Sequence, residues 1–217
     1  MRRMIGVSIG ARDTTEAHTA LREVAQSAAI AELRLDLMNE YDLSALLDER
    51  PCPVVVTNRA EREGGKAVGD DANRVQPLLQ AIDMRAEYVD VEHDAVHLIH
   101  DTKDTKLIAS SHDFQRMPHD LPGLHNKLVE TGADVVKLVG AARRLSDNVD
   151  VLELLSGTDV QTIAIAMGEA GLVSRVLALR YDSCLLTYST LDKGETVAPG
   201  QLTISSMRNT YHANHIG

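Results

Sequence analysis

The sequence contains few cysteines and no long apolar run. Its two cysteines, Cys52 and Cys184, form neither a CxxC pair nor a disulfide framework. The first residues, which read MRRMIG, contain no apolar stretch typical of a secretory signal. No apolar run approaches the roughly 20 residues that a membrane-spanning helix needs. We therefore expect a cytoplasmic protein with reduced thiols and no membrane partner.

Basic residues are also scarce. The 217-residue chain carries 22 Lys and Arg side chains against 32 Asp and Glu, which gives a formal net charge of −10. Nucleic-acid binding requires clustered basic side chains that neutralise phosphates, so we expect no nucleic-acid partner. The chain is 44% hydrophobic and 25% charged, as is typical of a globular protein. Because no linker, repeat or low-complexity tract interrupts it, we expect residues 1–217 to form a single domain.

Short apolar, β-branched runs alternate with stretches of helical period along the whole chain. Several runs, such as 54–56 and 163–165, are almost continuously hydrophobic, which is typical of a strand covered on both faces. The predicted strands are 5–9, 31–35, 53–57, 87–91, 106–110, 134–138, 162–166 and 184–188. The predicted helices are 15–28, 42–50, 72–85, 95–102, 122–131, 146–156, 172–181 and 204–212.

Eight strands that are each followed by a helix predict right-handed βαβ units and a parallel sheet. Eight such units close into a (β/α)8 TIM barrel, which is the α/β fold that we predict. A doubly wound open sheet is the alternative. The turn after the first strand reads SIGAR at 8–12 and lacks the GxGxxG of a dinucleotide-binding fold.

Charged residues occupy positions where the second and third predicted strands end, and in such a barrel the chemistry lies at these ends. Alternation along the second strand puts Glu32, Arg34 and Asp36 on one side. Charges that face a barrel interior must pair or bind a ligand, whereas a solvated edge strand would explain them without function. The loop 59–65 combines two arginines, two glutamates and a glycine pair, which would let an anionic ligand approach the backbone.

His112 follows the fifth predicted strand, and Lys137 lies within the otherwise apolar sixth. A histidine with an ordinary pKa near 6.5 can act as both acid and base at neutral pH, although a plain surface histidine is the alternative. Burial disfavours the charged form of an amine, and a neutral amine can form a Schiff base with a ketone or aldehyde. A lysine that snorkels to solvent or pairs with a carboxylate is the structural alternative.

Candidate anion-binding groups follow the last two strands. Arg175 lies in the first turn of the helix after the seventh strand, close to Gly168 and Gly171, where it could clamp a carboxylate or a phosphate. A Pro-Gly turn after the eighth strand presents the amide of Gln201.

A cluster of possible metal ligands follows the fourth strand. It consists of Glu92, His93, Asp94, His97 and His100. Metal-dependent barrel hydrolases use such ligands. The residues between them are apolar, however. We therefore favour an amphipathic helix that carries the histidines on its solvated face. We expect no metal site.

Six motifs, in order along nearly the whole chain, resemble type I 3-dehydroquinate dehydratase. They are ELRLD at 32–36, TNRAEREGG at 57–65, SSHDF at 110–114, ADVVK at 133–137, MGEAGLVSR at 167–175 and APGQ at 198–201. The resemblance implies a (β/α)8 barrel that forms a homodimer and uses neither a metal nor an organic cofactor. It also implies the dehydration of 3-dehydroquinate to 3-dehydroshikimate in the shikimate pathway.

The resemblance also implies a role for each matching residue. Lys137 would form the imine with the substrate ketone, and His112 would be first the general base and then the general acid. Glu63 would orient His112 and hold its charge state. The implied substrate-binding residues are Arg175 and Gln201 at the carboxylate, Met167 over the ring, Glu32, Arg34 and Arg59 at the ring hydroxyls, and Ser8 as a further ligand candidate.

Two other functions fit parts of this pattern. A class I aldolase also forms a Schiff base on a barrel-strand lysine, and a non-catalytic barrel could bind a pathway metabolite. The APGQ loop and His112 favour dehydration over aldol chemistry, and the presence of both Lys137 and His112 favours catalysis. Loop 59–71, with three glycines, is a candidate lid.

Overall fold

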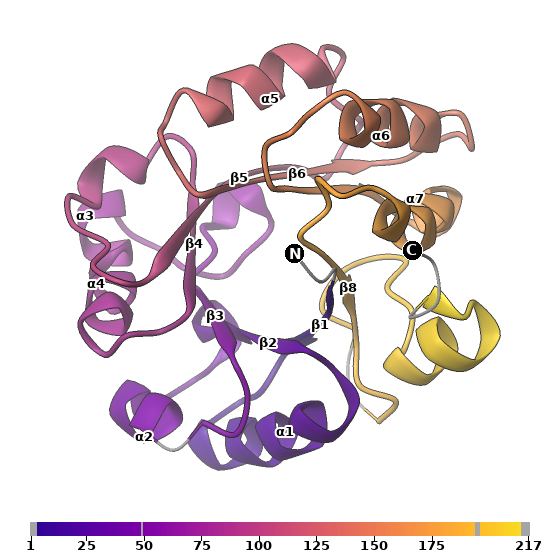
Figure 1. The fold of residues 1–217 in the computed structure, drawn as a ribbon. Coiled ribbons are helices and arrows are strands. Elements are labelled where there is room, and N and C mark those ends of the chain that lie inside the picture. Colours follow the sequence, from indigo (N-terminus) through magenta and orange to yellow (C-terminus); the bar gives the residue numbers. More distant parts are fainter. Residues whose placement is uncertain (1–3, 49, 194–195, 214–217) are drawn as a thin grey trace.

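The computed structural model describes residues 4–48, 50–193 and 196–213, and within them eight parallel strands form a nearly closed barrel surrounded by helices (Figure 1). The strands are β1 (Met4–Ile9), β2 (Ile30–Arg34), β3 (Val54–Thr57), β4 (Tyr88–Glu92), β5 (Lys106–Asp113), β6 (Val135–Ala141), β7 (Thr162–Met167) and β8 (Leu186–Ser189). The helices are α1 (Thr14–Ser27), α2 (Leu43–Asp48), α3 (Asp71–Arg74), α4 (Gln76–Asp83), α5 (Leu121–Val129), α6 (Asp147–Ser156) and α7 (Leu172–Leu177).

The ring of strands excludes the doubly wound alternative and confirms the predicted TIM barrel. Hydrogen-bonded neighbours run in the order β7-β6-β5-β4-β3-β2-β1-β8. The ends of this order meet at a parallel bridge between Thr162 and Cys184, where the Thr162 amide donates to the Ser183 carbonyl at 2.7 Å. All eight predicted strands are found, and β5 and β6 each run three residues further than expected.

Two of the predicted helices are wrong. The segment 72–85 is broken into α3 and α4 because Pro77, which lacks an amide hydrogen, begins a new helix. The segment 95–102 forms only a 3-10 turn at Val96–Leu98. Its apolar residues Ala95, Val96 and Ile99 reach the core directly from this turn, so no helix is needed to bury them.

The remaining helices agree with the prediction apart from their ends. Residue 49, in the predicted helix 42–50, lies outside the described residues. The predicted helix 172–181 ends as α7 at Leu177 and continues as a 3-10 turn over Ala178–Arg180. The last segment is helical from Ile204 but winds as a π-helix over Ser206–Thr210.

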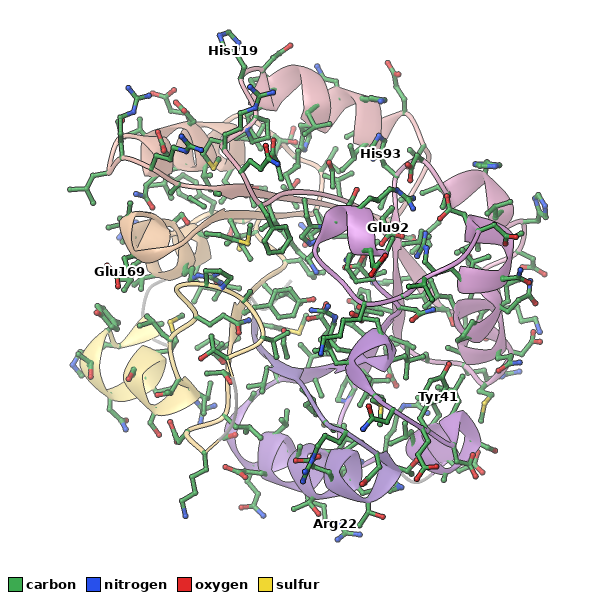
Figure 2. The ribbon with its side chains drawn as sticks, turned by 180° about the vertical axis from the view of Figure 1, so that it is seen from behind. Arg22, Tyr41, Glu92, His93, His119 and Glu169 are labelled. Atoms are coloured by element: carbon green, nitrogen blue, oxygen red, sulfur yellow. The ribbon has the colours of Figure 1, made fainter. Side chains whose placement is uncertain are left out.

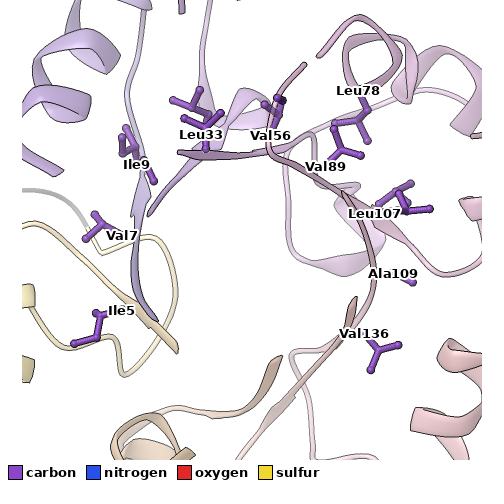
Figure 3. Close-up of a cluster of buried hydrophobic side chains, with 14 of the residues drawn as sticks. Ile5, Val7, Ile9, Leu33, Val56, Leu78, Val89, Leu107, Ala109 and Val136 are labelled. Carbon is purple, nitrogen blue, oxygen red and sulfur yellow. The ribbon is translucent and has the colours of Figure 1, made fainter. Parts of the chain in front are cut away.

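Alternation along the strands divides the core into an outer and an inner layer. Side chains such as Val7, Leu33 and Val56 point outward, where they meet apolar faces of the helices (Figure 3). The helix α1 illustrates this packing: Asp13 caps it by accepting a hydrogen bond from the Glu16 amide, and its buried face contains Ala17, Leu21 and Val24. None of the helices in the described part of the chain is long and apolar enough to cross a membrane.

Candidate active site

All the residues predicted to form the site line one cavity at the C-terminal ends of the strands. It holds about 510 Å³ of empty space, including its open mouth. The predicted residues on its wall are Ser8, Glu32, Arg34, Arg59, Glu63, His112, Lys137, Met167, Arg175 and Gln201. Figure 2 shows the surroundings: Glu92 lies on the inner side of the barrel, whereas Arg22, Tyr41 and His119 lie at its periphery.

Side chains that face the barrel interior form two layers. The layer near the N-terminal ends of the strands is apolar and includes Ile30, Val55, Tyr88, Ile108 and Val135. Two residues further along the same strands, the buried side chains are Glu32, Thr57, Asp90, Ser110 and Lys137. Side chains two residues apart point to the same face of a strand, so the polar layer lies directly above the apolar one.

Lys137 lies in this polar layer and is 4% exposed. Its Nζ donates hydrogen bonds to Asp90 Oδ2 at 2.8 Å and to Glu32 Oε1 at 3.1 Å. The ring centroid of Tyr188 lies 4.6 Å from the same nitrogen. The strand is apolar in sequence, but the lysine pairs with carboxylates from β2 and β4, as the structural alternative anticipated.

A chain of alternating charges leads away from Lys137 through Asp90. Arg59 Nη2 lies 2.5 Å from Asp90 Oδ1, and Arg59 Nη1 lies 2.9 Å from Glu92 Oε1. Glu92 also pairs with Arg74, whose Nη2 lies 2.5 Å from Glu92 Oε2. Burial alone would raise the pKa of the Asp90 carboxyl, but the charges of Arg59 and Lys137 outweigh it and hold that pKa well below its usual range.

Glu32 ends the charge chain on the other side of Lys137. The hydroxyls of Ser8 and Thr57 donate to its two oxygens at 2.5 and 3.1 Å. Burial would raise the pKa of Glu32, but the charges of Lys137 and Arg34 lower it overall. Glu32 is therefore a carboxylate at neutral pH, and its oxygens already have several partners.

The expectation that Asp36 shares a strand face with Glu32 and Arg34 is wrong, because β2 ends at Arg34. Asp36 lies in a 3-10 turn over Leu35–Leu37, where its oxygens accept two hydrogen bonds from Arg34 at 2.8 and 2.7 Å. It also accepts from the backbone amides of Arg59 and Lys66, at 3.2 and 3.1 Å. Asp36 thus ties Arg34 to the loop after β3.

His112 and Glu63 form a close pair at the cavity wall. His112 Nδ1 lies 2.9 Å from Glu63 Oε2, and the His112 backbone amide donates to the same oxygen at 3.1 Å. Burial, together with the charges of Arg59 and Lys137, lowers the pKa of His112 well below its ordinary value. Burial raises the pKa of Glu63 to about 7, despite the nearby Arg59. The pair therefore holds a neutral imidazole beside a carboxyl that ionises near neutrality.

Arg175 provides a positive charge that lacks a carboxylate partner among the described residues. Its Nη2 donates to the Pro199 carbonyl at 3.1 Å and its Nη1 to the Tyr188 carbonyl at 3.5 Å. Burial lowers its pKa to about 10, and its Nε is buried with no hydrogen-bond partner in the part of the chain that the structure describes. A buried guanidinium without a counter-ion is suited to bind an anion.

Gln201 and Met167 complete the same side of the cavity. The Gln201 Oε1 accepts from the backbone amides of Val197 and Ala198, each at 3.1 Å, which fixes the orientation of its amide. Met167 is buried and lines an apolar wall with Val139 and Ile165. The cavity thus has one side lined by paired charges from β2 to β6. Its other side is an apolar wall next to Arg175 and Gln201.

Contacts within the candidate lid loop, and one to the segment after β4, hold this loop in place. The Ala67 amide donates to the Arg59 carbonyl at 3.0 Å, and Arg62 forms ion pairs with Asp71 and Asp94. Gly64 adopts a φ of +76°, and a Cβ there would lie 2.2 Å from the ring of Phe114. Gly64 therefore allows Phe114 to lie across the loop, whereas closure of the loop stays a prediction.

The possible metal ligands after β4 do not converge. Glu92 points into the barrel and pairs with Arg59 and Arg74, and the helix that would align the histidines is not formed. Over residues 4–48, 50–193 and 196–213, no three His, Cys, Asp or Glu side chains are grouped so that they could hold a metal ion.

Asp90 and Tyr188, which both contact Lys137, were missed by the sequence analysis, and Glu92 was considered there only as a possible metal ligand. Asp90 and Glu92 alternate with apolar residues in β4 just as Glu32 and Arg34 do in β2, so the same argument would have found both. Tyr188 is the second-last residue of β8 and carried no distinguishing signal. Its place beside Lys137 depends on closure of the barrel, which brings β8 next to β7 and therefore only one strand away from β6.

The cavity lies where barrel enzymes carry their active sites, so the fold and the site together define a barrel enzyme. Comparison with known proteins is more specific. The chain belongs to the type I 3-dehydroquinase family, which it matches over residues 5–217.

Two relatives and one solved structure show the extent of this likeness. The chain is 34% identical over 217 residues to the bifunctional 3-dehydroquinate dehydratase/shikimate dehydrogenase of Arabidopsis thaliana, and the match spans 94% of this chain but only 35% of that protein. It is 35% identical over 196 residues to the 3-dehydroquinate dehydratase of Methanopyrus kandleri, covering 87% of this chain and 89% of the relative. The type I 3-dehydroquinate dehydratase of Clostridium difficile shares the fold, with a TM-score of 0.82, 21% identity and coverage of 100% of this chain and 94% of that one.

Proposed function

We propose that this protein is a lyase that dehydrates 3-dehydroquinate to 3-dehydroshikimate, a step of the shikimate pathway, through a Schiff base on Lys137. The names of the relatives supply the reaction, and one observation carries the mechanism. Lys137, the His112–Glu63 pair and the unpaired Arg175 all face one cavity. These groups are the amine, the proton shuttle and the anion clamp that this dehydration needs.

Lys137 begins the reaction as the nucleophile. The Lys137 ammonium gives up one proton, and the free amine adds to the ketone carbon of the substrate. The released proton goes to the hydroxyl of the resulting carbinolamine, which leaves as water, so that an iminium ion remains. The iminium accepts the electron pair that is released when a neighbouring C–H bond breaks, so the adjacent proton becomes far more acidic than it is beside a plain ketone. Asp90 and Glu32, at 2.8 and 3.1 Å from Nζ, balance the positive charge on this nitrogen.

His112 moves the protons in both of the following steps. Its Nδ1 faces Glu63 at 2.9 Å, so an ionised Glu63 accepts the Nδ1 hydrogen and leaves the lone pair on Nε2 to take the substrate proton. The resulting enamine expels the β-hydroxyl, to which the protonated His112 returns the proton so that water leaves. Hydrolysis of the conjugated iminium then releases the product and regenerates Lys137.

The other site residues bind the substrate in this proposal. Arg175 and Gln201 bind its carboxylate, and Met167 packs over the ring. The ring hydroxyls are held by Glu32, Arg34, Arg59 and Ser8. The proposal also includes a cytoplasmic homodimer whose residues 1–217 form a single catalytic domain, with no organic cofactor, no metal and no nucleic-acid or membrane partner.

Turnover of 3-dehydroquinate by the purified protein tests the proposal. The conjugated product absorbs ultraviolet light, so its formation can be measured by absorbance. We expect turnover by the unmodified protein and none above background by Lys137→Met, which keeps most of the side-chain volume. Binding of 3-dehydroquinate without turnover would overturn the proposal in favour of a metabolite-binding barrel. Carbon–carbon cleavage of a sugar substrate, with 3-dehydroquinate left intact, would identify an aldolase.

A further inference from the structure

Tyr188 lies at the cavity, yet none of the steps above uses it. It belongs to β8, is 3% exposed and lines the same cavity as Lys137. The Nζ of Lys137 lies over its ring, 4.6 Å from the centroid. The Tyr188 hydroxyl is buried and has no hydrogen-bond partner among the residues that the structure describes. Buried polar groups of native proteins usually have a partner, so this hydroxyl needs an explanation.

The ring supplies a contact that the carboxylates cannot replace during the reaction. The ammonium of Lys137 has three N–H donors, two of which point to Asp90 and Glu32. An iminium nitrogen keeps only one N–H, so imine formation removes a hydrogen bond to one of these carboxylates. The attraction between a cation and an aromatic face needs no N–H donor and is strongest where water is excluded. The ring of Tyr188 therefore continues to stabilise the nitrogen after the imine has formed.

The Tyr188 hydroxyl can donate a hydrogen bond to a bound ligand. Burial and the nearby carboxylates of Glu32 and Asp90 raise the pKa of Tyr188 well above its ordinary value, so the phenol keeps its proton. An interaction with the Glu32 carboxylate contributes to this rise, but the hydroxyl forms no hydrogen bond of ordinary geometry with any residue that the structure describes. The Nε of Arg175 is a second buried donor without a partner on the same wall, and the Arg175 Nη1 donates to the Tyr188 carbonyl. Two unpaired donors in one cavity call for a ligand rich in oxygen acceptors.

We propose that Tyr188 is a further residue of the reaction, with its ring stabilising the iminium nitrogen of Lys137 and its hydroxyl donating a hydrogen bond to an oxygen of the bound substrate. This inference rests on the proposed function. It assigns the two roles to different atoms of one side chain, so two substitutions separate them. Tyr188→Phe removes only the hydroxyl, whereas Tyr188→Leu removes the aromatic face as well.

Steady-state kinetics with 3-dehydroquinate, together with the fraction of enzyme trapped by borohydride during turnover, measure both roles. For Tyr188→Leu we expect kcat to fall about 30-fold, with a lower trapped fraction, because the desolvated cation loses its aromatic face. For Tyr188→Phe we expect most of kcat to be kept and KM to rise about 3- to 10-fold, because one hydrogen bond to substrate is lost.

Tyr88→Leu is the matched control, because Tyr88 is also a buried tyrosine of the barrel interior but does not line the cavity. It should lower thermal stability and leave kcat and KM unchanged. A Tyr188→Leu enzyme that is folded and has an unchanged kcat would overturn the ring's role, as would a Tyr188→Phe enzyme with the same loss of kcat. An unchanged KM in Tyr188→Phe would overturn the hydroxyl's role. If the unmodified protein neither turns over the substrate nor is trapped, the proposed function itself fails, and this inference fails with it.

Discussion

Inside the barrel, Val55, Ile108 and Val135 pack against one another, while Thr57, Ser110 and Lys137, each two residues further along the same strands, lie among buried charges. The two layers are separated by roughly 6.6 Å along each strand. They share the same backbone, the same register and almost the same exclusion of water. Only the chemistry of their side chains differs.

The two layers contribute differently: the apolar layer stabilises the barrel, and the polar layer carries the candidate active site. The apolar layer gains free energy by burial and packing alone. The polar layer holds Glu32, Asp90, Arg59 and Lys137 away from water, and a buried ion pair is often no more stabilising than apolar residues of the same shape. Stability therefore does not explain the charged layer, whereas the proposed reaction, which needs an oriented amine, would explain it.

The largest effect should follow from removing the amine of the polar layer. We expect Lys137→Met to lower kcat by more than about 10⁴-fold, beyond the range that general acid–base groups usually contribute, because no Schiff base can form. The ultraviolet absorbance of the conjugated product measures the rate. Turnover within tenfold of the unmodified protein would show that Lys137 is not the nucleophile.

Loss of the proton shuttle should cost less than loss of the amine. We expect His112→Ala to lower kcat about 10²- to 10⁴-fold, because proton removal and hydroxyl departure lose their acid–base group while the imine can still form. Borohydride should therefore still trap a substrate adduct on this variant, although turnover is slow. A variant with neither trapping nor turnover would place His112 in imine formation instead.

The Glu63–His112 pair predicts how activity depends on pH. Below about pH 7, a protonated Glu63 donates to His112 Nδ1, which places the imidazole hydrogen on Nε2 and removes the base. We therefore expect kcat/KM to rise with pH through about 7. In Glu63→Gln the amide oxygen can accept the Nδ1 hydrogen at every pH, so this step should vanish, leaving a plateau roughly 10- to 100-fold lower. A step that persists in Glu63→Gln would assign the ionisation to another group.

The same carboxyl predicts a pH dependence of stability. Its pKa is about 7 in the folded protein and lower in the unfolded chain, so the folded state binds the extra proton. This contribution is fully present below the unfolded pKa and is lost as pH rises through about 7. Urea unfolding at several pH values should show a smaller decline in Glu63→Gln, and an identical decline would contradict the assignment.

The smallest effect on catalysis should come from the apolar layer. Ile108 is fully buried two residues before Ser110 on β5, so Ile108→Ala should lower the free energy of unfolding by about 2–5 kcal/mol. We expect its kcat to stay close to that of the unmodified protein. Ser110→Ala is the matched change in the polar layer, where it removes hydrogen bonds to Arg59 and Asp90 and should lower kcat with a smaller loss of stability. If the two variants lost activity alike, the two layers would not be functionally distinct.

Much of this architecture was predictable because it depends on the spacing of apolar residues in helices and on the alternation of side chains along strands. The strands followed from short apolar runs, and the polar faces of β2 and β6 followed from single residues at alternating positions. The break at Pro77 was also available from the sequence, since proline interrupts a helix. The single turn at Val96–Leu98 was not, because it depends on contacts that only the folded core provides.

The partners of each site residue were the least predictable part. The sequence shows Lys137 as an amine in an apolar strand. Its two carboxylate partners, Glu32 and Asp90, lie 105 and 47 residues away in the chain. Tyr188 meets Lys137 only because the barrel closes, and no local pattern marks it. In the sequence Asp36 continues the alternation of β2, yet the strand stops at Arg34 and the carboxylate turns to the loop after β3.

The most direct test of the account is borohydride reduction in the presence of 3-dehydroquinate, followed by intact-mass measurement and peptide mapping. The account predicts a single ligand-derived adduct on Lys137, with none in Lys137→Met. Turnover of 3-dehydroquinate with no adduct on the folded protein, or an adduct on a different lysine, would contradict the claim that Lys137 forms the Schiff base.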